Sequence, residues 1–294
     1  MNFSVERAAS VDDFLRRTEP FRDEYSMETN LIGAVATSVA TGAKSYPECF
    51  WWIVLQGVEV IGLAMRTPPF RLVLSPMPED AARQLAAVVA QSDPNFWGVN
   101  GPEDPASQFM ETWCALTNRN KNDFPINMWE TIYVLGDHTP LPAVAGSARK
   151  ADEKDAQFLS EWVFDFANEI GVFQPEPPTE TDILKRLEFT AMMIWQVDGR
   201  PVAMSGHSAL VVDGDKRIGR IGPVYTEPKE RGHGYGAAVT SAMIEHLESL
   251  GCTSIMLYAD SDYEKSNRVY QGLGFRQVGV IVEIGEPPTT IEKP

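Results

Sequence analysis

Three glycines at alternate positions constrain this chain more than any other feature of its sequence. They occupy positions 232, 234 and 236 in the stretch RGHGYG, directly before a run of residues with the apolar spacing of a helix. Glycine weakens helices and strands, so three of them indicate a backbone geometry that side chains would obstruct. A helix N-terminus exposes about four N–H groups and a partial positive charge, which together favour an anionic ligand. The stretch therefore predicts a phosphate-binding loop at a helix start.

Two widespread phosphate-binding patterns compete for this loop. A Walker-type loop requires Lys followed by Ser or Thr after its last glycine, whereas this chain has alanine at positions 237 and 238. A Rossmann fingerprint of the form Gly-x-Gly-x-x-Ala is present at Gly232, Gly234 and Ala237. Asp260 ends the next predicted strand, at a plausible sequence separation for the acidic residue that binds the ribose in such a site. However, the residues TEPKER separate the preceding strand from the glycines, and that strand has antiparallel neighbours by its pattern. A Rossmann-type dinucleotide-binding protein is therefore the less favoured alternative.

The second half of the chain predicts an antiparallel meander between helices. Asp198-Gly199 and Asp213-Gly214 interrupt apolar runs in residues 191–225, which is typical of strands joined by hairpins. Periodicity and turn signals predict helices over residues 151–171, 181–189, 237–250 and 263–271, and strands over 253–259 and 275–284. Leu250 belongs to the apolar face of the third helix in this pattern.

The first half repeats that order without the glycines. Its pattern predicts strands within residues 50–76 and at 95–101, and helices at 78–91 and 105–116. Where the second half has RGHGYG, the first has PMPEDA, which favours an internal duplication with one inactive copy. We expect a domain over residues 1–136, a linker over 137–146 and a second domain over 147–294. One domain with unrelated α/β halves is the alternative.

Two motifs of the second half resemble the GNAT superfamily of N-acetyltransferases. Its pyrophosphate loop, Arg or Gln followed by x-x-Gly-x-Gly or Ala, is similar to residues 231–236, and SNRVYQGLGF (266–275) is similar to its second acetyl-CoA motif. IGPVYTEP before the loop, together with Thr67-Pro68-Pro69 in the first half, resembles a group of tandem acetyltransferases with a degenerate N-terminal half. The resemblance implies an α/β (α+β) fold of two tandem GNAT-like domains, each a mixed, mostly antiparallel sheet flanked by helices.

The resemblance also implies an acetyl-CoA site in the second domain. The residues expected to bind this cosubstrate are Val224, Tyr225, Thr226, Arg231, Gly232, His233, Gly234, Tyr235, Gly236, Asn267 and Tyr270. Val224 to Thr226 would pair with the pantetheine arm where the sheet opens, and an amide near Tyr225 would stabilise the developing oxyanion. Tyr270 occupies the general-acid position, and Asn267 lies one helical turn earlier. Packing beneath the last strand is the structural alternative for Tyr270, and a surface position is that for Asn267.

The general base is harder to assign from the sequence. His207, in VAMSGHSAL, is a candidate because the unperturbed pKa of histidine suits proton transfer near neutral pH. The favoured interpretation is nevertheless an interior histidine whose ring nitrogens are both hydrogen-bonded. Glu161, Asp165 and Glu169 share a helix expected near the acceptor, where a solvated charged face explains them.

Composition narrows the remaining functions. The formal net charge of −16 disfavours nucleic-acid and membrane partners, and the three cysteines have neither disulfide nor zinc spacing. With no membrane-length apolar run and no signal-peptide pattern, we expect a cytoplasmic protein. The expected function is acetyl transfer from acetyl-CoA to a primary amine, either a small molecule or amino-acid-like, without a metal. A non-catalytic acyl-CoA sensor or scaffold is the alternative, and the sequence carries no expectation about oligomeric state.

Overall fold

The computed structural model describes residues 3–92, 97–171, 174 and 176–286. Its contacts divide the chain into unit 1, residues 1–132 with 279–294, and unit 2, residues 133–278. The division falls inside two strands, β6 (Ile126–Leu135) and β13 (Phe275–Gly285). Unit 1 thus takes its last segment from the far end of the chain, a feature that no sequence pattern indicated. The expected domain boundaries at 136 and 147 remain a prediction.

Unit 1 is a mixed sheet between two helical layers. Its other elements are β1 (Phe3–Arg7), α1 (Val11–Glu24), α2 (Asn30–Ala40), β2 (Phe50–Gln56), β3 (Glu59–Arg66), β4 (Leu72–Leu74), α3 (Glu79–Ser92), β5 (Gly98–Gly101), α4 (Glu103–Thr117) and the short η1 (Lys121–Asp123). Strands β1 to β4 pair antiparallel in sequence order, β4 and β5 pair parallel, and the end of β13 pairs antiparallel with β5. Residues 95 and 96 of the predicted strand 95–101 lie outside the described residues.

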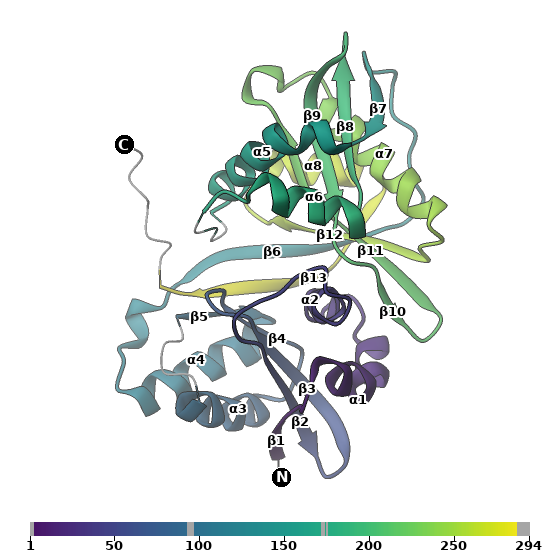
Figure 1. Ribbon diagram of the computed structural model, residues 1–294. Helices are drawn as coiled ribbons and strands as arrows, with labels where there is room; N and C mark the ends of the chain where they lie inside the picture. Colours follow the sequence, from purple (N-terminus) through teal and green to yellow (C-terminus); the bar gives the residue numbers. More distant parts are fainter. Residues whose placement is uncertain (1–2, 93–96, 172–173, 175, 287–294) are drawn as a thin grey trace. The chain divides into compact units, whose positions relative to one another are not determined.

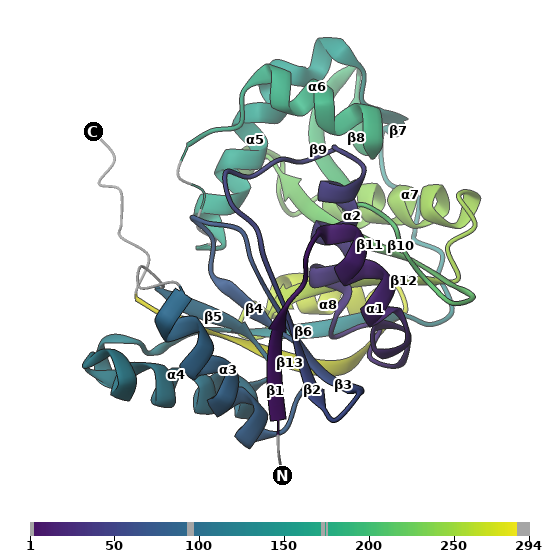
Figure 2. The same ribbon diagram turned by 60° about the horizontal axis from the view of Figure 1, so that its bottom comes forward.

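Adjacent tryptophans show how the sheet of unit 1 separates two cores. Successive side chains of a strand point to opposite faces, so Trp51 and Trp52 on β2 enter different cores. Trp51 packs on Phe14 of α1, with ring centroids 5.2 Å apart, whereas Trp52 joins the cluster formed with α3 and α4. Figure 2 shows the two helix pairs on the two sides of these strands.

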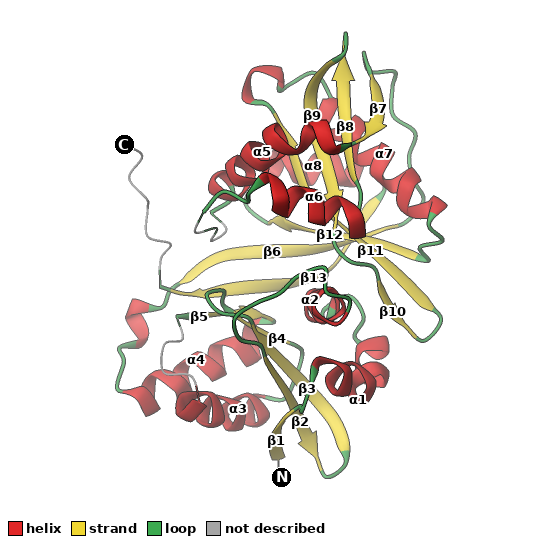
Figure 3. Ribbon diagram, viewed as in Figure 1, coloured by secondary structure: helices red, strands yellow, loops and turns green. Residues whose placement is uncertain are grey.

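Unit 2 follows the same order of elements. They are β7 (Ser147–Lys150), η2 (Glu153–Asp155), α5 (Ala156–Glu169), α6 (Glu180–Phe189), β8 (Met192–Val197), β9 (Arg200–His207), β10 (Val211–Asp213), β11 (Lys216–Thr226), η3 (Pro228–Glu230), α7 (Tyr235–Ser249), β12 (Ser254–Asp260) and α8 (Glu264–Gly272). The strand order is β7-β8-β9-β11-β12, antiparallel except for the parallel pair β11–β12. The short β10, which pairs with β11, is the added element. The predicted α/β fold with two similar halves is confirmed (Figure 3).

The two predicted hairpins form in unit 2, one of them shifted by a residue. Asp198 and Gly199 connect β8 to β9 with φ of 51° and 77°, the left-handed geometry that suits a two-residue hairpin. In the second hairpin Asp213 pairs with Lys216, so the turn consists of Gly214 and Asp215, and Asp213 ends the strand.

Helices cover both faces of the unit 2 sheet (Figure 1). Helices α5 and α6 pack on the face that carries Met192, Met204 and Tyr225, whereas α7 packs on the opposite face. Helix α7 begins at Tyr235, two residues before the predicted start. Leu250, predicted on its apolar face, is 37% exposed because the helix has already ended at Ser249.

Within the described residues, none of the helices combines the length and the apolar character that a membrane crossing requires. The cytoplasmic location expected from the sequence stays a prediction.

Candidate functional site

Two different constraints account for the three glycines of the loop before α7. Gly232 and Gly234 have φ of +85° and +84°, in the left-handed region that side chains rarely adopt. Gly236 lies inside the first helical turn, where an added Cβ would stand 3.1 Å from Oγ1 of Thr226. The first two positions therefore require glycine for backbone conformation, and the third for close approach to β11.

The start of α7 presents a row of available backbone donors. The first hydrogen bond of the helix runs from the N–H of Ala238 to the carbonyl of Gly234, at 3.0 Å. The N–H groups of residues 232–237 donate to no group in the described part of the chain, and Gly234 offers no capping side chain. No acidic residue lies in the first turn. This helix terminus can thus bind an anion through backbone donors and its dipole.

The side chain of Arg231 holds the loop in place. Its Nη2 contacts both carboxylate oxygens of Glu169 on α5 at 2.7 Å, and its Nε donates to the carbonyl of Thr226 at 3.0 Å. The side chain is therefore already engaged, so Arg231 is placed to serve a ligand through its backbone. Glu169, which the sequence placed on a solvated face, here ties α5 to the loop.

Strands β11 and β12 part immediately before the loop. Their parallel pairing covers Ile218–Ile221 and Ser254–Leu257, although β11 continues to Thr226 and β12 to Asp260. The register between β11 and β9 shifts between Ile221 and Val224, as a bulge produces. Residues 224–226 then pair with β9 on one side, which leaves the edge toward β12 available for a ligand.

The three residues of this edge alternate between the two faces. Val224 packs with the α7 core, and the hydroxyl of Thr226 approaches Gly236. Tyr225 points to the opposite face, where its ring lies 5.6 Å from that of Trp162 on α5. Burial, together with the carboxylates of Asp165 and Glu169, raises the pKa of Tyr225 to about 12. Tyr225 thus lines the α5 side of the opening as a neutral phenol.

Asn267 and Tyr270 share helix α8, as predicted, beside the end of β12. The amide nitrogen of Asn267 donates to the carbonyls of Asp260 and Ser261 at 2.9 and 3.1 Å, whereas its buried Oδ1 accepts no hydrogen bond from the described part of the chain. Tyr270 packs against Tyr133 and Phe275. Burial raises the pKa of Tyr270 to about 12, so it carries its proton at neutral pH. The Oδ1 of Asn267 and the protonated hydroxyl of Tyr270 are therefore available to a ligand.

His207 is a satisfied interior histidine, the interpretation that the sequence favoured. Its Nε2 accepts a hydrogen bond from the N–H of Ala191 at 2.9 Å, and its Nδ1 lies 2.7 Å from the carbonyl of Ser208. This carbonyl requires the proton on Nδ1, so both nitrogens are occupied in the neutral ring. Burial lowers the pKa of His207 to about 4. A general base needs a free lone pair, which this side chain lacks.

Arg186 on α6 is a residue at this opening that sequence reasoning missed. Its Nη2 donates to the carbonyl of Gly222 at 3.1 Å, at the bulge of β11. The segment KRLEF has the charge pattern of an exposed helix face, so nothing in the sequence singled this arginine out. Among the described residues, no cluster of three or more His, Cys, Asp or Glu side chains could hold a metal ion.

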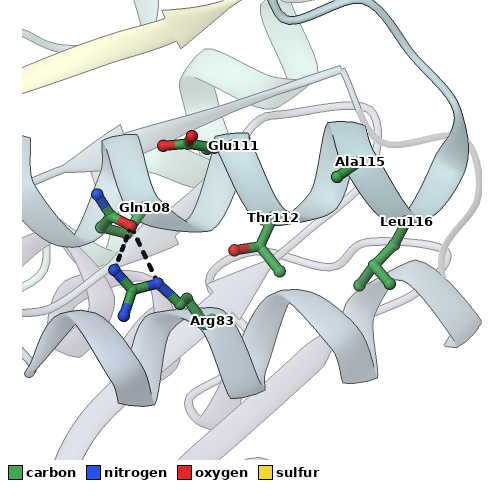
Figure 4. A pocket seen from close by; sticks show the side chains of 6 residues that line it. All are labelled: Arg83, Gln108, Glu111, Thr112, Ala115 and Leu116. Atoms are coloured by element: carbon green, nitrogen blue, oxygen red, sulfur yellow. Dashed lines mark hydrogen bonds between the residues drawn. The ribbon is translucent and has the colours of Figure 1, made fainter.

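A separate hollow lies on unit 1, between α3 and α4, with a volume of about 510 Å³. Figure 4 shows Arg83 reaching from α3 to Gln108 on α4, at 2.7 and 3.1 Å, with Leu116 at the other end. The lining residues Arg83, Gln108, Glu111, Thr112, Ala115 and Leu116 include neither a histidine nor a cysteine, and we place the candidate chemistry at the glycine loop of unit 2.

Together, unit 2 is an α/β unit in which a glycine-shaped helix N-terminus lies beside a parted pair of parallel strands, an arrangement that can accept an extended anionic ligand. Residues 156–275 match the acetyltransferase (GNAT) family. This range contains the loop, β11, β12 and α8. The match covers most of unit 2.

Curated relatives share a short stretch with this chain. The mycothiol acetyltransferase of Thermobispora bispora is 43% identical over 61 residues, 21% of each chain. That of Kocuria rhizophila is 37% identical over 60 residues, 20% of each chain. The matched stretch thus spans about a fifth of the length of these relatives.

Solved structures resemble the chain over nearly its full length. A GCN5-related N-acetyltransferase from Kribbella flavida has 17% identity and a TM-score of 0.57, covering 88% of this chain and 97% of that one. A tandem GNAT protein from the clavulanic acid biosynthesis pathway has 14% identity and a TM-score of 0.56, covering 96% and 98%. The whole chain therefore has the fold of tandem GNAT proteins.

Proposed function

We propose that this protein is an acetyl-CoA-dependent N-acetyltransferase that acetylates a primary amine in unit 2. The observation that carries the proposal is the row of available N–H groups at residues 232–237, next to the open edge of β11. The proposal includes the domain bounds expected from the sequence, with a degenerate domain over residues 1–136 and a catalytic domain over residues 147–294.

The described residues fit coenzyme A at three points. The start of α7 offers backbone donors to a pyrophosphate, and bulky side chains are excluded there by the two left-handed glycines. The edge of β11 over residues 224–226 offers strand-like pairing to the pantetheine amides. The buried Oδ1 of Asn267 lacks a donor, which a ligand N–H would supply, since a buried acceptor without a partner is costly.

The bound cosubstrate supplies an activated thioester, and the chain supplies a proton. Transfer forms a bond between the amine nitrogen and the acetyl carbon and breaks the bond from that carbon to sulfur. The nitrogen gives up a proton to solvent, and the thiolate receives one. Tyr270 suits the second role because its hydroxyl stays protonated and makes no hydrogen bond within the described residues.

The test measures acetyl-CoA binding by calorimetry, and thiol release with a panel of amines. Gly234→Glu places a carboxylate and a left-handed side chain at the N-cap of α7, so we expect binding to weaken at least about 100-fold. Gly251→Glu is the matched control, because Gly251 also has a left-handed φ of +76° and open space, but lies beyond the other end of α7. Equal affinity in the wild type and Gly234→Glu would refute the site. Tight binding without turnover of any amine would instead support a sensor.

A further inference from the structure

The guanidinium group of Arg186 lies at the point where β11 leaves β12. Its Nη2 donates to the carbonyl of Gly222, the first residue beyond the parallel pairing. An added Cβ on Gly206 of β9 would stand 2.9 Å from the same nitrogen. The group therefore rests against the backbone of two strands, and a glycine on β9 makes the room for it.

Among the described residues, this positive charge has no carboxylate partner. The bond to Gly222 is the only hydrogen bond of the Arg186 side chain within the described part of the chain, although a guanidinium carries five donors. Burial and the nearby Arg220 lower the pKa of Arg186 to about 10, which still leaves it charged at neutral pH. In a chain with 41 acidic residues, a partly buried arginine without a carboxylate contact among the described residues is unusual, because charges removed from water are normally paired.

A second arginine lies on the same face of the sheet. Gly219 faces Leu247 of α7, so its neighbour Arg220 points to the other face, which α5 and α6 cover. The Arg220 guanidinium lies 5.2 Å from the ring centroid of Tyr258 on β12. Strands β11 and β12 thus carry positive charge and a phenol at the start of their opening, on the side opposite α7.

We propose that Arg186, with Arg220 nearby, binds the carboxylate of the acceptor, so that the acceptor is an amine that also carries a carboxylate. The inference rests on the function proposed above and names the class of its acceptor. A guanidinium fork matches the two oxygens of a carboxylate, and the remaining donors of Arg186 are available for this contact. The pyrophosphate of coenzyme A is provided for elsewhere, at the far end of residues 224–226 and on the α7 face. The amine of a ligand held by Arg186 would lie along the opened edge.

The first experiment compares amino acids with their decarboxylated amines in the thiol-release assay. The pairs are L-lysine and cadaverine, L-phenylalanine and phenethylamine, and β-alanine and ethylamine. For the best pair, we expect the wild type to prefer the carboxylate-bearing member, and Arg186→Gln to reduce that preference in kcat/KM at least ten-fold, through the acceptor KM. Differences in amine basicity cancel, because the same pair is compared in both proteins.

Two further variants and the KM for acetyl-CoA distinguish a loss of carboxylate recognition from a general loss of folded structure. Arg186→Lys keeps the charge without the fork and should retain part of the preference. Lys185→Gln removes an exposed positive charge from the same helix and should retain all of it. The KM for acetyl-CoA should change less than two-fold in Arg186→Gln. A preference that is unchanged in Arg186→Gln would overturn the inference.

A binding measurement decides the inference even if no amine is acetylated. Calorimetric titration of the same pairs into the protein saturated with coenzyme A reports carboxylate recognition without turnover. Tighter binding of the carboxylate-bearing member, lost in Arg186→Gln, supports the inference and leaves the failure with the proposed transfer. Equal or absent binding of both members of every pair overturns the inference itself.

Discussion

In each unit one helix connects the two parallel strands, α3 between β4 and β5 in unit 1 and α7 between β11 and β12 in unit 2. The first turns of these two helices differ in their residues and charge. Helix α7 starts behind left-handed glycines and has no acidic residue in its first turn, whereas α3 starts with Glu79 and Asp80. These carboxylates compensate the partial positive charge of the α3 terminus and would repel phosphate. The same order of elements therefore has a helix start without acidic side chains in unit 2 and an acidic one in unit 1.

The parallel strand pairs beside these helices also differ, because one pair parts at its end and the other does not. In unit 2, β11 and β12 part after Ile221. In unit 1, Gly101 at the end of β5 lies so close to Leu74 that an added Cβ would stand 2.8 Å from its carbonyl oxygen. Strands β4 and β5 thus stay in contact to their ends and leave no edge for a ligand. Binding an extended cofactor requires both a bare helix start and an open edge, and only unit 2 has both among the described residues.

The largest expected effect concerns the number of cofactor sites. The wild-type chain should bind one acetyl-CoA in a calorimetric titration, and Gly234→Glu should remove that site without revealing a second. A double variant, Glu79→Gln with Asp80→Asn, should also bind one, because it frees the α3 dipole while β4 and β5 stay closed. A stoichiometry of two in any of these proteins would break the comparison between the units.

Tyr270→Phe should lower kcat about 100-fold while leaving acetyl-CoA binding within about three-fold. The variant removes the hydroxyl and keeps the ring that packs on Tyr133 and Phe275. Tyr133→Phe is the control, because it removes a phenol from the same cluster whose oxygen already accepts from Gln271. Since the pKa of Tyr270 is raised to about 12, wild-type activity should not fall through its ionisation below about pH 10. Undiminished turnover in Tyr270→Phe would remove Tyr270 from the acid role.

These contrasts show which features the sequence could predict. The loop glycines, the hairpins, the helices of the second half and helices α3 and α4 follow from local rules of backbone conformation and periodicity. Helices α1 and α2 went unassigned, and the pairing of the last strand with β5 depends on residues far apart in the chain. Tyr270 and Asn267 came from a motif. The role of Arg186 depends on the distant carbonyl of Gly222, and that of Glu169 on the distant side chain of Arg231. The features that the sequence did not predict are those that depend on tertiary contacts, which periodicity does not encode.

His207 gives a pH dependence to the stability of unit 2. In unfolded chain its pKa is near 6.5, and burial lowers it to about 4 in the folded protein. Between these values the unfolded chain binds a proton that the folded one does not, so its stabilising contribution is present above pH 6.5 and is lost as pH falls toward 4. The linkage amounts to about 3 kcal/mol across this window.

Urea unfolding at pH 7.5, 6 and 5 measures this loss. His207→Gln should show a flatter dependence on pH than the wild type, whatever its stability at pH 7.5. The last residue of the corresponding strand in unit 1, Arg66, is equally buried but does not titrate in this range, so the effect should belong to unit 2. Parallel pH profiles of the two proteins would contradict the assignment of the slope to His207.

The smallest effect concerns the two arginines near the compared helix starts. Arg83 is held by Glu79 and Asp80 of its own helix, whereas Arg231 is held across the loop by Glu169 of α5. All three ion pairs are partly exposed, and each such pair contributes about 0.5 kcal/mol. Glu169→Gln should lower the free energy of unfolding by about that amount. It should also change the acetyl-CoA KM less than about three-fold, because the lost anchoring of the loop is offset by removal of a negative charge near the pyrophosphate. Glu79→Gln should cost similar stability and leave that KM unchanged.

If Glu169→Gln instead raised the KM more than ten-fold, the α5 contact would be a requirement for the site, and the open edge with a bare helix start would not suffice.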